Sequence, residues 1–166
     1  MLLAPKGNLI TNGDFEEGEP GSPPEGWVST NVALSGPELA FTGDRAALLG
    51  GPDPGQWAVL HQDVTVCPMR RYLLTFQAGA AGQSPPELIV QVRWLDSSGT
   101  DLGLGLHVHL LSRSLGPVEC GVWNVQTHVT DCAPLGTCMA RVVFTKGGGS
   151  GSSPIVLDAV TFAGIG

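Results

Sequence analysis

Two acidic residues that stand in apolar segments are the first candidates for chemistry. Glu16 lies in the opening segment 8–18, and Asp158 lies in the apolar run 155–162 near the other end of the chain. Both segments read as β-strands, and a carboxylate that is buried without a partner is energetically expensive. We therefore expect Glu16 and Asp158 to be neighbours in space, where they could share a calcium ion.

A second group of candidates has the side-chain types that bind sugars. A flat aromatic ring can cover the apolar face of a sugar, and planar polar groups can hydrogen-bond to its hydroxyls. Among the four tryptophans, Trp57 follows Pro54-Gly55-Gln56 and is expected to be the most exposed, whereas Trp94 and Trp123 share the parity of core positions. The outward positions of the strands expected at 88–95 and 122–129 carry Gln91, Arg93, Asn124, Gln126 and His128. If both strands belong to one sheet, these side chains form a polar groove; an ordinary solvated sheet face is the alternative.

The sequence gives little support for catalysis. Its acidic residues are scattered and mostly fall in turns, whereas a glycosidase needs two opposed carboxylates at a fixed separation. The Gly-x-Ser-x-Gly pattern of a serine nucleophile does not occur. His107 and His109 share one face of a strand and could bind a transition metal together with His61 or His128, but their outward position also fits ordinary surface histidines. We therefore expect a protein that is not an enzyme.

The composition limits the class of protein and of partner. A chain of 166 residues is expected to form a single domain, 1–166. The formal net charge is -7 and no basic cluster occurs beyond Arg70-Arg71, which argues against a nucleic-acid partner. No apolar run is long enough for membrane insertion. Residues 1–6 are too short for a signal peptide, so the sequence leaves the compartment open.

The four cysteines leave two alternatives open. Cys132 and Cys138 flank a short turn, where a disulfide could close a hairpin; free thiols are the other alternative. No Cys-x-x-Cys spacing occurs, so a zinc knuckle is not expected.

Short alternating segments predict the fold class. Strands are expected at 8–18, 27–30, 39–41, 46–49, 57–66, 71–78, 88–95, 106–111, 122–129, 139–145 and 154–162. Residues with turn-forming side chains separate them, and no helical period of useful length occurs. In the segment 122–129 the alternation places Trp123, Val125, Thr127 and Val129 on the core side. Such a pattern predicts an all-β, antiparallel sandwich or barrel.

A series of motifs, in this order, resembles a known family. The motifs are Asn-Leu-Ile-x-Asn-Gly-x-Phe-Glu at 8–16, Gly-Trp at 26–27, Thr-Gly-Asp-Arg-Ala-Ala-Leu at 42–48, Leu-His-Gln-Asp-Val at 60–64, Tyr-Leu-Leu-Thr-Phe at 72–76, Trp-Leu-Asp at 94–96, Ala-Pro-Leu-Gly-Thr at 133–137, Ala-Arg-Val at 140–142 and Leu-Asp-Ala-Val at 157–160. Together they are similar to the galactose-binding-like jelly rolls, and especially to the carbohydrate-binding modules that accompany bacterial xylanases and glucanases. The resemblance implies a jelly-roll β-sandwich and favours an extracellular, cell-surface or spore-surface location.

The resemblance also implies a structural calcium between the first and last strands. Its ligands would be the carboxylates of Glu16 and Asp158, with main-chain oxygens near Asp14, Gly43 and Arg45. Calcium takes six to eight oxygen ligands, which suits carboxylates and the carbonyls of a glycine turn. Alternatively, the two carboxylates cap turns or accept hydrogen bonds from backbone amides.

Two functional hypotheses follow. In the first, the chain is a non-catalytic module that resembles carbohydrate-binding modules and binds a polysaccharide or other glycan on a sheet face. In the second, it is a structural protein of a bacterial surface or spore layer and forms homo-oligomers through its sheet faces. A small hydrolase is the weakest of the readings.

Overall fold

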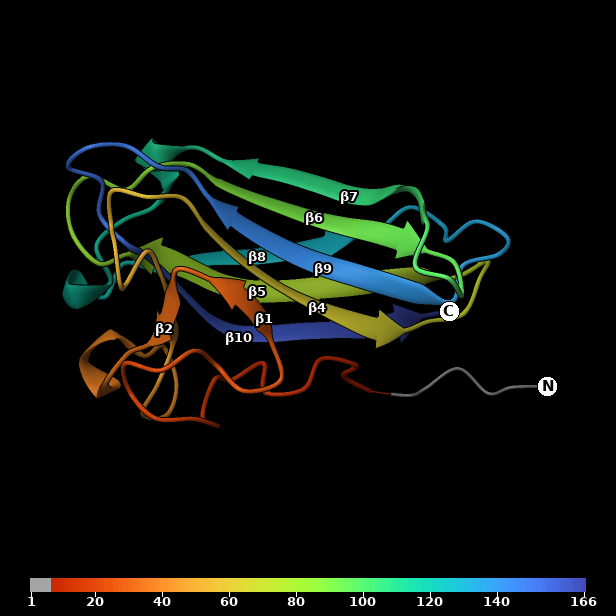
Figure 1. Ribbon diagram of the computed structural model, residues 1–166, viewed down its shortest axis with the longest axis horizontal. Helices are drawn as coiled ribbons and strands as arrows, with labels where there is room; N and C mark the ends of the chain where they lie inside the picture. Colours follow the sequence, from red (N-terminus) through yellow and green to blue (C-terminus); the bar gives the residue numbers. More distant parts are fainter. Residues whose placement is uncertain (1–6) are drawn as a thin grey trace.

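The protein is a sandwich of two antiparallel β-sheets. The computed structural model describes residues 7–166, and Figure 1 shows the two sheets lying one behind the other. Each sheet has five strands. The predicted all-β jelly roll is therefore confirmed, whereas the expectation about a signal peptide concerns residues 1–6, which lie outside the described residues.

The two sheets are named here by their strand order. Sheet A has the order β1-β4-β9-β6-β7, and its strands are β1 (Val28–Thr30), β4 (Ala58–Thr65), β9 (Met139–Lys146), β6 (Leu88–Leu95) and β7 (Asp101–Leu110). Sheet B has the order β2-β3-β10-β5-β8, and its strands are β2 (Val32–Leu34), β3 (Ala47–Leu49), β10 (Ile155–Ile165), β5 (Arg71–Ala80) and β8 (Asn124–Val129). Three short 3-10 turns lie in the loops: η1 (Pro37–Leu39), η2 (Ser112–Ser114) and η3 (Val118–Cys120).

Strand β6 shows why the pattern of alternating residues produces this architecture. Leu88, Val90, Val92 and Trp94 are all buried between the sheets, as the sequence predicted. Successive side chains of a strand point to opposite faces, so Gln91 and Arg93 point away from the core. β6 pairs with β7 on one side and with β9 on the other; its register with β9 is continuous, whereas the ladder with β7 shifts after Val92 and after Trp94.

Strand β8 has the opposite orientation to the predicted one. Gln126 and His128 pair with Phe76 and Leu74, whose side chains are buried in the core, so they share the inner face of sheet B. Val125 and Val129 point outward and are exposed. The prediction failed because β8 is an edge strand. Its inner side is only half-buried, which allows polar side chains there.

The opening segment is not a strand. Residues 8–18 form turns and irregular backbone instead of joining a sheet ladder. The segment nevertheless follows β10, because Leu9 N donates to Phe162 O at 2.7 Å and Val160 N donates to Gly13 O at 2.8 Å. The expected strand at 39–41 is also wrong, since η1 and an extended loop occupy that region, and the three-residue strand β2 was not predicted.

Gln62 ties the opening segment to sheet A. Its Oε1 accepts hydrogen bonds from Thr11 N at 2.9 Å and Thr11 Oγ1 at 3.3 Å. Its Nε2 donates to Thr11 O at 3.0 Å and to Gly26 O at 3.1 Å. The amide is buried, so no water can replace these bonds without opening the structure. Among residues 7–166, no helix is long and apolar enough to span a bilayer.

Replacing this buried amide should destabilise the fold. We expect Gln62→Leu to lower the free energy of unfolding by about 2 kcal/mol, because several backbone groups lose their partner. Urea denaturation measures the loss. The control is Gln126→Leu, since Gln126 bonds only to the side chains of Asn124 and His128 and should cost less. Equal losses in both variants would contradict the role given to Gln62.

Candidate functional site

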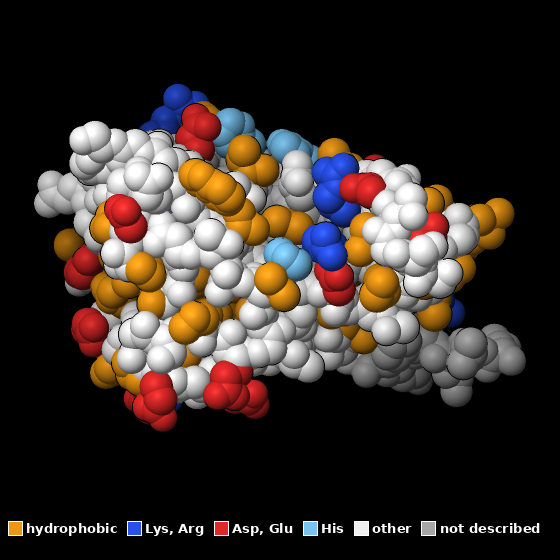
Figure 2. All heavy atoms as spheres, viewed as in Figure 1, with side chains coloured by type: hydrophobic (Ala, Val, Ile, Leu, Met, Phe, Trp, Pro, Cys, Tyr) orange, Lys and Arg blue, Asp and Glu red, His pale blue; other side chains and the backbone are white. Residues whose placement is uncertain are grey.

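The outward side of sheet A carries the densest group of polar side chains that lie together. Figure 2, seen from this side, shows histidines and both kinds of charged side chain across its middle. The sheet A face is defined by the outward residues His61, Asp63, Gln91, Arg93, Asp101, His107, His109, Arg141 and Val143. They come from β4, β9, β6 and β7, so the consecutive strands β6 and β7 and two strands distant from them in sequence form one surface.

One row across the sheet A face consists of imidazole, amide and aliphatic groups. His61 pairs with Val143, Val143 with Gln91, and Gln91 with His107. The amide Nε2 of Gln91 lies 3.0 Å from Nδ1 of His107, which fixes the orientation of both planar groups. Burial, reinforced by the nearby Arg141 guanidinium, lowers the pKa of His61, and its Nδ1 is buried without a hydrogen-bond partner.

The next row carries Arg141 and Arg93 side by side at its centre, and each of them is bonded to one aspartate. Arg141 donates two hydrogen bonds to Asp63, from Nε at 2.7 Å and from an Nη atom at 2.8 Å. Arg93 lies directly opposite Arg141 and donates to the carboxylate of Asp101. Each guanidinium therefore has its own carboxylate. The hydrogen bond from Arg141 is the main reason that the pKa of Asp63 lies below its ordinary value, and the bond from Arg93 does the same for Asp101.

Aliphatic side chains flank the polar rows on the side of the His61 row. Val59 and Ile89 pair with Thr145 from either side, and the row ends at His109, whose Nε2 lies 2.7 Å from the carboxylate of Glu87. Val59, Thr145 and Ile89 lie on the outward side of β4, β9 and β6, and the two aliphatic side chains, Val59 and Ile89, are half-buried. The sheet A face thus combines half-buried aliphatic side chains with planar hydrogen-bonding groups.

Trp57 stands at one end of the sheet A face. Its side chain is 56% exposed, as the sequence predicted, and it precedes β4 with the same parity as Val59 and His61. The ladder between β4 and β9 ends at Ala58 and Lys146. Beyond it Gly148 approaches the backbone of Trp57, since a Cβ at Gly148 would lie 3.1 Å from Trp57 N. An exposed aromatic ring therefore borders the polar rows.

The polar groove expected from the sequence does not form. Gln91 and Arg93 lie on β6 in sheet A, whereas Asn124, Gln126 and His128 lie on β8 in sheet B. The three β8 side chains point inward and hydrogen-bond to one another in a chain along the strand. That prediction is wrong because it assumed that both strands belong to the same sheet.

The sequence overlooked the partners that Gln91 and Arg93 have in the structure. Asp63 and His61 alternate with core residues in β4, and Arg141 does so in β9, so their outward orientation was readable from the pattern. Their association was not readable. The pair Asp63–Arg141 joins residues 78 positions apart, and only the strand order of the sheet brings them together.

Glu16 and Asp158 bind the same turn, residues 41–45. Glu16 accepts hydrogen bonds from the backbone amides of Asp44 and Arg45, both at 3.0 Å. Asp158 accepts from Phe41 N at 2.9 Å and Thr42 N at 3.1 Å. This arrangement, in which the carboxylates accept hydrogen bonds from backbone amides, was expected from the sequence as the alternative to a metal site.

The environment of Asp158 is costly for a negative charge. Asp158 is fully buried, and burial together with the nearby Glu16 raises its pKa to about 6 despite three amide donors. Gly43 has a positive φ of 67°, and a Cβ there would lie 2.3 Å from Glu16 Oε1, so glycine is required under the Glu16 carboxylate. Asp14 completes the local chain, since its Oδ1 accepts from Glu16 N at 3.4 Å.

The other sequence candidates for metal binding or disulfide formation are not brought together. His107 and His61 occupy opposite ends of the row described above, with two strands between them. Within residues 7–166 no cluster of three or more histidine, cysteine or acidic side chains could hold a metal. Cys132 and Cys138 are exposed free thiols.

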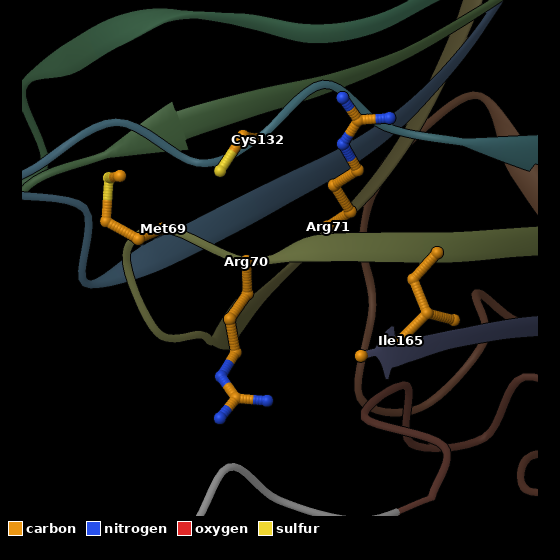
Figure 3. A pocket seen from close by; sticks show the side chains of 6 residues that line it. Met69, Arg70, Arg71, Cys132 and Ile165 are labelled. Atoms are coloured by element: carbon orange, nitrogen blue, oxygen red, sulfur yellow. The ribbon is translucent and has the colours of Figure 1, made fainter.

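A cavity of about 600 Å³ lies at the end of the sandwich where β5 begins and β10 ends. It is lined by Met69, Arg70, Arg71, Cys132, Ile165 and Gly166. Figure 3 shows the guanidinium groups of Arg70 and Arg71 pointing to opposite sides of the strand. Because they do not converge, they do not form a single anion site.

Comparisons with known proteins identify the fold. No protein-family model matches the chain, and no curated protein matches it. Among solved structures, a family 16 carbohydrate-binding module has a TM-score of 0.64 at 23% sequence identity, with 94% of this chain and 99% of that chain covered. A family 61 module in complex with β-1,4-galactotriose has a TM-score of 0.61 at 18% identity, with 95% and 99% covered. The chain has the jelly-roll fold of carbohydrate-binding modules.

A third similar structure is the enzymatically active domain of a tailspike protein of bacteriophage CBA120. Its TM-score is 0.70 at 21% identity, and the match covers 95% of this chain and 21% of the tailspike chain. The chain thus spans about a fifth of that protein. Since all three identities are low, the similarity establishes the fold, and function has to be argued from the surface of this chain.

The pairing on the sheet A face predicts a measurable titration. Because the pKa of Asp63 is lowered, its pair with Arg141 contributes stability above the unfolded pKa near 3.8, and this contribution is lost as pH falls through the folded pKa. We expect Arg141→Gln to raise the pKa of Asp63 and to cost less than about 1 kcal/mol, since the pair is partly solvated. Carboxyl NMR titration measures the shift. Arg93→Gln is the control, and an equal rise there would contradict the assignment.

Proposed function

We propose that this chain is a non-catalytic module that binds a glycan across the sheet A face. The observation that carries the proposal is the surface itself, where planar polar side chains alternate with half-buried aliphatic ones and an exposed tryptophan stands at one end. Sugars present the matching chemistry, since hydroxyls project around a ring whose faces are partly apolar.

The size of the surface favours an extended ligand. Neighbouring strands lie about 4.8 Å apart, so the path from β4 to β7 over three strand spacings is about 14 Å long. The planar groups of His61, Gln91 and His107 follow this path in one row. A chain of several sugar rings laid across the strands would contact each of them.

The charges favour a neutral glycan over an acidic one. Both arginines of the sheet A face already bind carboxylates, Arg141 with Asp63 and Arg93 with Asp101. The whole chain has a formal net charge of -7, which repels anionic polysaccharides. Paired carboxylates and guanidinium groups can still exchange hydrogen bonds with uncharged hydroxyls.

The comparisons support this proposal through the fold. The similar structures include modules whose names state carbohydrate binding, one of them in complex with β-1,4-galactotriose. The sheet A face has no central aromatic platform, so we expect weak binding, with a Kd on the order of 0.1–1 mM, in which hydrogen bonds contribute most.

Retention on insoluble polysaccharides tests the proposal. We expect the wild-type chain to be retained on at least one neutral polysaccharide, such as xylan, β-glucan or galactan, and Gln91→Ala to weaken retention about tenfold, because a ligand hydrogen bond and the orientation of His107 are lost. Gln126→Ala is the matched control, since Gln126 lies on the inner side of sheet B. Loss of retention in the control alone, or no retention of the wild type on any of the three, would contradict the proposal.

We also propose that Glu16 and Asp158 hold a structural calcium ion. The donor set fits, because two carboxylates lie at one glycine-containing turn and hard cations prefer oxygen ligands. The buried Asp158, with its raised pKa, would gain a compensating positive charge. Main-chain oxygens near Asp14, Gly43 and Arg45 would complete the shell.

Thermal unfolding with calcium or a chelator tests the metal proposal. Ligand that binds only the folded state should stabilise it by about 4 kcal/mol at a thousand times its Kd, so a rise in Tm is expected with calcium. Glu16→Gln should abolish the rise, whereas Glu17→Gln, at an exposed neighbouring position, should keep it. An unchanged Tm for the wild type would eliminate the calcium site while leaving the glycan proposal intact.

A further inference from the structure

The outward side of sheet B is divided into a covered part and an open part. A small second core of Ala46, Val118 and Val156, with neighbouring loop residues, covers the part near η1 and η3. The open part is called the sheet B face and is defined by Thr75, Gln77, Val125, Thr127, Val129 and Thr161. It lies on the opposite side of the sandwich from the sheet A face.

Three threonine hydroxyls form a row across the sheet B face. Thr75 pairs with Thr161 of β10 on one side and with Thr127 of β8 on the other. The hydroxyls of Thr75 and Thr161 hydrogen-bond to each other. Each hydroxyl can both donate and accept, and the strands that carry them are spaced about 4.8 Å apart. Such a row suits a ligand that itself presents repeated hydroxyls.

An aromatic pair lies where the sheet B face meets the covered part, and Trp123 of this pair packs against the second core. Phe41 and Trp123 pack edge to face with ring centroids 5.3 Å apart and an interplanar angle of 69°. Phe41 is 42% exposed, and Trp123 continues the outward parity of Val125. Because Asp158 accepts the hydrogen bond from Phe41 N, the turn that carries this ring is held in place. The sheet A face has its exposed ring at an end as well, but without such a partner.

Gln77 provides a polar group that no part of the described protein satisfies. It lies between Asp158 and Val125 in the register of sheet B, and its Oε1 is buried without a hydrogen-bond partner. A buried carbonyl oxygen without a donor costs free energy that a ligand hydroxyl could recover after a small rotation of the amide. Gln77 lies two residues from Thr75 on β5, so the unpaired amide oxygen and the threonine hydroxyls belong to the same surface.

The sheet B face contains no charged side chain among its six defining residues, in contrast to the sheet A face. An ionic ligand would therefore gain nothing there. From the hydroxyl row, the aromatic pair and the unpaired amide oxygen, we propose that the sheet B face is a second sugar-contact surface, for a neutral glycan. A second copy of this chain is the competing occupant, because its threonine hydroxyls could also donate to the Gln77 oxygen. The self-association outcome of the test below separates the two occupants.

Two sugar-contact surfaces on opposite sides would make one chain bivalent. The module would then bridge two glycan chains or two strands of one network, and its avidity would exceed the affinity of either face. This inference goes beyond the proposed function, because it concerns a separate sheet and separate residues.

Amide NMR shifts distinguish the two faces directly. The probes are xylohexaose, cellohexaose and β-1,4-galactotetraose, added to labelled wild type and to the double variant Gln91→Ala/His107→Ala. We expect at least one sugar to shift amides at 73–77, 125–129 and 161–163 in both proteins. Val125→Lys, at a position 65% exposed, should weaken these shifts about tenfold by placing a charge on the face. Leu135→Lys, at a loop position 78% exposed, is the control and should leave them unchanged.

Each outcome decides the inference separately from the proposed function. Shifts on the sheet B face that survive the double variant support the inference, even if sheet A amides stay silent and the proposed function fails. Shifts confined to sheet A amides overturn it while the proposed function stands. If no amide of either face shifts with any of the three sugars, both the inference and the proposed function are overturned. Concentration-dependent broadening of sheet B amides without sugar overturns it in favour of self-association.

Discussion

The contact between the buried carboxylate of Asp158 and the turn 41–45 is the constraint on which the rest of the structure depends. Asp158 accepts amide hydrogen bonds from Phe41 and Thr42, and Glu16 accepts those of the next residues of the turn. The first segment, an early loop and the last strand are thereby joined at one point. Since a buried carboxylate without donors would be strongly unfavourable, any arrangement that separates these three segments is penalised. The turn 41–45 holds Phe41 in position. The pairing of β10 with β5, and of β5 with β8, sets the register of sheet B.

The inner faces of both sheets carry hydrophobic side chains, whereas their outer faces carry different types of side chain. Their inner residues form one hydrophobic core, with Trp94, Tyr72 and Phe144 among the largest fully buried side chains. The outer residues are free of that packing requirement, so they can carry different chemistry. Sheet A carries paired charges, histidines and a glutamine, whereas sheet B carries threonines, valines and an aromatic pair. This difference underlies the assignment of hydrogen-bonded glycan contacts to one face and of a second, uncharged surface to the other.

The sequence predicted the fold better than the site, for a physical reason. In a central strand such as β6, both neighbours and both faces constrain the pattern, so the alternation of Leu88 to Trp94 identified the core side correctly. In the edge strand β8, the inner side is half-solvated and the outer side is apolar, so the same reasoning reversed Gln126 and Val125. Sheet membership is not encoded in local alternation at all. Gln91 and Arg93 were predicted as candidate site residues, but their hydrogen-bond partners His107 and Asp101 became apparent only once the strand order was known.

The central claim is that the sheet A face binds a glycan. The most direct measurement is a crystal structure of the full chain grown with an oligosaccharide of a polysaccharide that retains it. The account predicts sugar density across β4, β9, β6 and β7, with hydroxyls within hydrogen-bonding distance of Gln91 and His107. Sugar density only in the loops at the ends of the sandwich, with the sheet A face covered by ordered water alone, would contradict the account.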